Sequence, residues 1–119
     1  MPLNLAHKNL DVYQVSQDIL VECYLLVKSF PKDERYNLAA QIKSAALSVN
    51  LNLAEGCSRR SASERRRFFE ISRGSIIELD AALVLAVKLG LITFDTMLQL
   101  DQLISRCFSM LSKLIGKSV

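Results

Sequence analysis

The chain has 119 residues, of which 50% are hydrophobic and 23% charged, a composition that fits one globular domain and excludes a largely disordered protein. Its formal net charge of +3 comes from residues 57–73, where six arginines accompany two glutamates, while the remainder nets −1. The longest uncharged helical stretch, residues 44–54, is far shorter than the roughly 20 apolar residues of a membrane span.

Two further features bound the protein class. Cys23, Cys57 and Cys107 are odd in number and contain no C-x-x-C pair, which argues against a disulfide framework and a zinc site. The opening residues lack the cationic and apolar segments of a signal peptide, so we expect a cytoplasmic protein.

The first half of the chain predicts two helices. Apolar residues recur at spacings of three and four over 12–30, after Asp11 as a plausible N-cap and before Pro31, which should end the helix. A second stripe covers 34–56 and contains small residues that permit close helix approach. We expect this helix to end at Gly56 in a left-handed C-cap.

The second half predicts two more helices, over 62–89 and 94–115. Ser61 and Glu64 have the spacing of a capping box, Gly90 is the expected C-cap, and Thr93 opens the last helix. Gly74 lies mid-helix, which would make sense if another backbone passed close to it. Four helices joined by short links and no strand pattern predict an all-α, antiparallel up-down four-helix bundle in a single domain, 1–119.

The third helix is apolar on every side between residues 81 and 87. A four-helix bundle covers only the inward face of each helix, so the outer half of this run would remain in water in a monomer. We therefore infer a homo-oligomer with Ala81, Val84 and Leu85 in its interface.

The residues that catalysis or cofactor binding would require are missing. The single histidine, His7, lies outside the expected helices and excludes a di-iron bundle, which needs two Glu-x-x-His motifs. No phosphate-binding glycine loop and no nucleophile–base pair can be recognised. We expect a protein that is not an enzyme and that carries no metal or cofactor.

A group of polar residues lies on the second and third helices, near the hinge that joins them. We interpret it first as a structural network that holds the two helices in register, since buried polar groups are normally paired. A ligand pocket, or an enzyme site built on Asn52 and Glu55, is the weaker alternative. The members are Gln41, Asn52, Glu55, Arg67, Ser75 and Glu78.

The arginine-rich hinge suggests an anionic partner. The null hypothesis is a solvated charge run with intramolecular ion pairs to Glu64 and Glu70, and the functional hypothesis is contact with nucleic-acid phosphates. A ring that repeats the patch in each subunit would multiply weak contacts. The expected nucleic-acid-binding residues are Arg59, Arg60, Arg65, Arg66 and Arg73.

Five stretches follow one another in a specific order: F-P-K-D-E-R-Y-N-L, Q-I-K-S-A-A-L-S-V, N-L-A-E-G, R-R-S-A-S-E-R-R-R-F-F-E-I-S-R-G-S-I-I-E-L and L-G-L-I. Together they resemble the four-helix-bundle proteins encoded in intervening sequences of bacterial 23S ribosomal RNA genes. A related bundle is the accessory variability determinant of diversity-generating retroelements, a partner of a reverse transcriptase. Asn50 and Asn37 depart from the family pattern, which has proline and glycine there.

The resemblance implies a small cytosolic bundle that assembles as a homopentamer, has a basic surface proposed to bind nucleic acid and has no established catalytic activity. We therefore expect a non-enzymatic oligomer that binds RNA or DNA through its basic hinge. The alternative is a protein-interaction scaffold, for example for a reverse transcriptase or a ribosome-associated factor.

Overall fold

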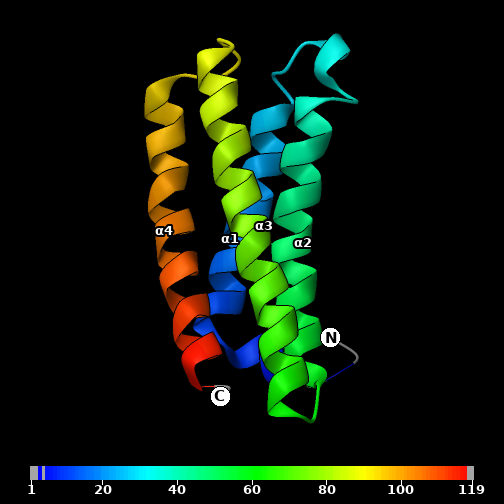
Figure 1. Cartoon of the computed structure of the whole chain (residues 1–119). Helices are drawn as coiled ribbons and strands as arrows, with labels where there is room; N and C mark the ends of the chain where they lie inside the picture. Colours follow the sequence, from blue (N-terminus) through cyan, green and yellow to red (C-terminus); the bar gives the residue numbers. More distant parts are fainter. Residues whose placement is uncertain (1–2, 4, 118–119) are drawn as a thin grey trace.

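A computed structural model describes residues 3 and 5–117 (Figure 1). In this part of the chain the secondary structure is entirely helical, which confirms the all-α, four-helix prediction. The elements are the 3-10 helix η1 (Ala6–Asn9), α1 (Asp11–Val27), the 3-10 helix η2 (Lys32–Glu34), α2 (Leu38–Ser58), α3 (Ala62–Lys88) and α4 (Phe94–Lys117).

Successive long helices run along the bundle in opposite directions (Figure 1). The connection between α2 and α3, residues 59–61, lies at the same end as the start of α1 and the end of α4, and we call this the hinge end. The opposite end carries the α1–α2 and α3–α4 connections, and we call it the far end. Helices α1 and α3 each pack against both α2 and α4, so α1 and α3 lie on a diagonal of the bundle.

The first two helices have different limits from those expected. Helix α1 ends at Val27, and residues 28–30 continue as tight turns with bonds such as Phe30 N to Val27 O at 3.1 Å. Pro31 disfavours a helical conformation of the residue before it, which explains this tightened end. Helix α2 starts at Leu38 rather than at 34, because η2 forms a separate turn, and it ends at Ser58.

Gly56 is not the predicted left-handed C-cap. It lies within α2, and among the described residues only Gly90 has a positive φ, of 75°. A Cβ atom at Gly56 would lie 2.7 Å from Cε1 of Phe69, a buried residue of α3. Glycine is therefore required at this position because α2 and α3 approach closely near the hinge, and not because of backbone handedness.

The ends of α3 and α4 match their sequence signals. The Ser61 Oγ accepts a hydrogen bond from Glu64 N at 3.1 Å, although the reciprocal bond of a full capping box does not form in the described structure. At the other end, Gly90 N and Leu91 N donate to the carbonyls of residues 87 and 86, a Schellman motif. Thr93 Oγ1 caps α4 by accepting from Thr96 N at 3.1 Å.

The core follows the predicted apolar stripes of all four helices. Its largest fully buried side chains include Ile19, Ile42, Leu53, Ile76, Leu79, Leu83 and Leu111. Gly74, by contrast, would accommodate a Cβ with no neighbouring atom within 4 Å, so no other backbone segment among the described residues passes close to it.

Candidate nucleic-acid interface

The α2–α3 connection is held by Arg65, the fourth residue of α3. Its Nη1 donates to the backbone carbonyls of Arg59 at 3.1 Å and Arg60 at 2.6 Å, across the turn. The Arg65 side chain is partly buried. Its guanidinium therefore stabilises the hinge, and it is less available to an external phosphate than its sequence position suggested.

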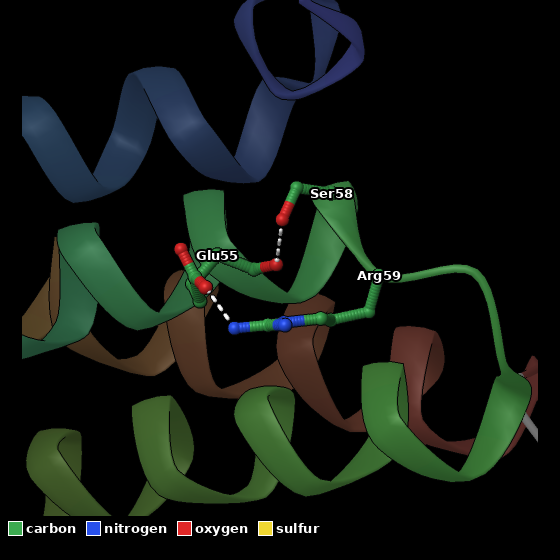
Figure 2. Close-up of polar contacts among 3 residues, drawn as sticks. All are labelled: Glu55, Ser58 and Arg59. Carbon is green, nitrogen blue, oxygen red and sulfur yellow. Dashed lines mark hydrogen bonds and ion pairs between the residues drawn. The ribbon is translucent and has the colours of Figure 1, made fainter.

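Arg59 is held against the end of α2 (Figure 2). Its guanidinium pairs with the Glu55 carboxylate and lies 4.9 Å from the centre of the Phe68 ring. The Ser58 hydroxyl donates to the carbonyl of Glu55 at 2.7 Å, which fixes the last turn of the helix (Figure 2). The Glu55 and Arg59 side chains are 47% and 39% exposed, so water screens the pair strongly.

The remaining hinge arginines fall into two kinds. Arg66 Nε donates to Glu70 at 2.9 Å, an exposed ion pair one helical turn apart. Arg60 and Arg67 are exposed, and their guanidinium groups make no hydrogen bond or ion pair with any described residue. Arg67 does not join Glu55, whose carboxylate is taken by Arg59.

Arg73 does not belong to the hinge. It lies 11 residues beyond the start of α3, about 16 Å along the helix axis at 1.5 Å per residue. Its Nη1 donates to the Ser112 hydroxyl at 3.1 Å, and its guanidinium carbon lies 5.7 Å from the centre of the Phe108 ring. Arg73 therefore joins α3 to α4 in the middle of the bundle.

Basic residues are concentrated at the hinge end of the molecule. The half of the bundle nearest the hinge, residues 3, 5–19, 48–75 and 105–117, contains ten basic and five acidic side chains, a net charge of +5. The far half contains five basic and seven acidic side chains, a net charge of −2. The up-and-down path of the helices adds Lys8, Arg106, Lys113 and Lys117 to the six arginines of residues 57–73.

The structure brings together only part of the expected polar network. Asn52 Nδ2 donates to the carbonyl and hydroxyl of Ser48, at 2.9 and 3.0 Å, and the Ser48 hydroxyl bonds to Ser75 Oγ at 2.7 Å. Gln41 and Glu78 are exposed and form no hydrogen bond with a described residue. The network therefore consists of Asn52, Ser48 and Ser75, and it joins α2 to α3.

Sequence reasoning missed Ser48 as a polar partner, and it missed two other buried bonds. The Ser72 hydroxyl donates to the carbonyl of Val49 at 2.7 Å, and Asn50 Nδ2 donates to Ser16 Oγ at 3.0 Å. The small residues of α2 were the available signal, because a serine that permits close approach also brings its hydroxyl to the neighbouring helix. Asn50 thus fixes α1 against α2.

The apolar run of α3 has a core side and an outer side. Ala82, Leu83 and Ala86 are buried, whereas Val84 is 37% and Leu85 51% exposed. Ala81 is exposed as well. The expected interface residues therefore share an uncovered apolar face in the single chain.

The described residues contain no cluster of three or more histidine, cysteine or acidic side chains that could hold a metal ion. None of the helices in the described part is long and apolar enough to cross a membrane. Cys57 is half-buried beside the hinge, where burial raises the pKa of its thiol and the Arg65 charge opposes that rise.

Comparison with known proteins places this fold in a family. The family described as 23S rRNA-intervening sequence protein matches residues 8–113, and no curated protein matches the chain. A crystal structure of a protein of unknown function from the S23 ribosomal protein family of Bacteroides thetaiotaomicron has a similar fold. Its TM-score is 0.79 at 17% identity, with 87% of this chain and 97% of that chain covered. The chain belongs to the 23S rRNA-intervening sequence protein family.

Proposed function

We propose that this chain is a non-enzymatic, oligomeric RNA-binding bundle whose hinge end contacts phosphate groups. The observation that carries the proposal is that Arg60 and Arg67 are exposed without an intramolecular partner, at the end of the molecule with a net charge of +5. Charges that are not neutralised within the fold are available to neutralise phosphates and release their counterions.

The arginines that form ion pairs can also contact phosphates, because little free energy is lost when their ion pairs open. Exposed ion pairs such as Glu55–Arg59 and Arg66–Glu70 contribute only about 0–1 kcal/mol each, so a phosphate can replace the carboxylate. Arg65 has a different role, because replacing its bonds to the hinge carbonyls would disturb the turn that presents Arg60.

The assembly we propose is a ring of antiparallel bundles joined partly through the outer face of α3. Val84 and Leu85 lie in the half of α3 nearest the far end, so an interface there leaves the hinge uncovered. A ring would place one basic end per subunit on the same side, and contacts made in parallel raise the total affinity. The resemblance to the family implies five subunits.

The test compares the wild type with Arg60→Glu/Arg67→Glu in binding to single-stranded RNA over a range of salt concentrations. Each phosphate neutralised on a single strand contributes about −0.7 to the slope of log affinity against log salt. The slope of the variant should therefore be less steep by about 1.4 for each subunit that contacts the RNA. The control variant, Gln41→Glu/Lys88→Glu/Gln102→Glu, undergoes the same change in net charge at exposed positions of the far half of the bundle.

An equal loss of affinity in both variants would mean that net charge, and not the hinge, controls binding. Wild-type protein that binds neither RNA nor DNA at low salt would refute the proposal. Such a result would favour the scaffold alternative, in which the arginines meet an acidic protein surface. Circular dichroism and light scattering of each variant separate a binding defect from a folding or assembly defect.

A further inference from the structure

The α1–α2 connection at the far end borders a cavity that the hinge proposal does not use. The cavity has a volume of about 470 Å³ and lies between the end of α1, the residues around η2 and the first two turns of α2. Phe30 and Ala39, both buried, form part of its lining. A volume of this size falls within the range of about 300–1,000 Å³ that is typical of small-molecule sites.

The charged side chains that line this cavity are all basic. They are Lys28, Lys32, Arg35 and Lys43. The two acids of the same connection, Asp33 and Glu34, are not part of the lining, and the Glu34 carboxylate accepts a hydrogen bond from Leu38 N at 3.4 Å. The groove between α3 and α4 has the opposite character, since Asp80 and Asp101 line it.

None of these four basic side chains forms an ion pair in the described structure. Four like charges around one hollow repel one another unless an anion lies among them. The far half of the bundle has a net charge of −2, so this concentration of positive charge is local and does not result from the overall charge of that end. The arrangement fits an anion held by several donors, of which Arg35 can bind two phosphate oxygens at once.

The cavity also offers an aromatic surface beside the charges. Tyr24 lines it and is 42% exposed, and the Lys43 ammonium group lies 5.6 Å from the centre of the Tyr24 ring. Flat rings stack on exposed aromatic side chains, a contact that nucleic-acid-binding proteins use with any base. A ligand that joins a phosphate to a flat ring would use both features.

We propose that this cavity binds a nucleoside phosphate, with the phosphate among Lys28, Lys32 and Arg35 and the base against Tyr24. The chemistry has two possible sources, a free nucleotide or the phosphorylated end of an RNA strand. The site lies at the opposite end of the bundle from the hinge, so the inference does not depend on the proposed hinge function.

The test is titration calorimetry with AMP, adenosine and inorganic phosphate at low salt. AMP should bind at least tenfold more tightly than adenosine, because only AMP carries a phosphate group that can pair with the basic side chains. Lys32→Glu/Arg35→Glu should lower AMP affinity at least tenfold, whereas Arg60→Glu/Arg67→Glu, with the same net charge, should leave it unchanged. All four positions are exposed, so neither variant removes core packing.

Tyr24→Leu examines the aromatic part of the site. It should lower the affinity for AMP while leaving that for inorganic phosphate unchanged. Competition then separates the two sources of the ligand. A free nucleotide is indicated if AMP binds more tightly than a 5′-phosphorylated oligonucleotide. The end of an RNA strand is indicated if the 5′-phosphorylated oligonucleotide binds more tightly than AMP and the 5′-hydroxyl form of the same oligonucleotide does not. Absence of AMP and oligonucleotide binding, equal affinity for AMP and adenosine, or equal losses in both double variants would overturn the proposal.

Discussion

Gly56 and Gly74 provide a direct test of how closely α2 and α3 pack near the hinge. Both lie inside helices, where alanine is favoured over glycine by about 0.5–1 kcal/mol. At Gly74 the new methyl group meets no described atom within 4 Å, so Gly74→Ala should raise the free energy of unfolding by about that amount. At Gly56 the same methyl group would lie 2.7 and 2.8 Å from two ring carbons of Phe69.

Phe69 is 3% exposed, so its ring cannot turn out into solvent without leaving the core. Overpacking of this kind typically costs about 1–3 kcal/mol. The Gly74→Ala variant should therefore have a free energy of unfolding higher than that of Gly56→Ala by this amount. Urea unfolding at equal protein concentration measures both values, provided that the denaturant dependence is unchanged. Equal stabilisation by the two substitutions would refute the close approach. A loss of stability in Gly74→Ala together with a smaller particle would instead place a second subunit's backbone at Gly74.

Three further predictions concern the thiols, the α1–α2 contact and the assembly. Burial raises the pKa of both the Cys23 and the Cys107 thiols from 9.0 to about 12. A nearby glutamate makes a smaller contribution to the rise at Cys23. A maleimide should therefore label Cys57 first in the folded protein, as peptide mass spectrometry would show. The free energy of unfolding should also fall as the pH rises above 9, because Cys23 and Cys107 then ionise only in the unfolded chain. Asn50→Ala should lower the free energy of unfolding by about 1–2 kcal/mol, because it removes the buried bond to α1; an unchanged urea midpoint would contradict this role. Leu85→Glu should give a smaller but still helical species by light scattering if α3 has an inter-subunit face, and a monomeric wild type at micromolar concentration would exclude that face.

The four helices could be predicted because their signal is local and repeated. An apolar spacing of three and four extends over many residues, so it identifies each helix and its buried side without any knowledge of the neighbours. The limits of α1 and α2 were less accessible, because residues 28–37 form 3-10 and tight turns whose hydrogen bonds depend on the exact path around Pro31. Gly56 shows a related difficulty, since a glycine required by close approach looks the same in sequence as one required by handedness.

The candidate site was predictable as a region but not residue by residue. Counting charges located the basic patch, and the spacing of four residues between Glu55 and Arg59 made their ion pair accessible in principle. The role of Arg65 was not accessible, because it depends on how residues 59 and 60 turn their carbonyls toward α3. The position of Arg73 could have been read from helix length alone, which separates it from the hinge by about three turns.

The distribution of partners among the hinge arginines leads to a prediction about stability as well as binding. Arg59, Arg65 and Arg66 each have an intramolecular partner that offsets part of the repulsion within the basic end. Arg60 and Arg67 have none among the described residues, so in the free protein they add repulsion without a compensating contact. Arg60→Gln/Arg67→Gln should therefore raise the urea midpoint at low salt and weaken RNA binding at the same time. The gain in stability should vanish at about 1 M salt, where the Debye length is about 3 Å. A variant that is less stable than the wild type at low salt would show that these arginines support the fold, and the case for a free phosphate-binding surface would lose its main observation.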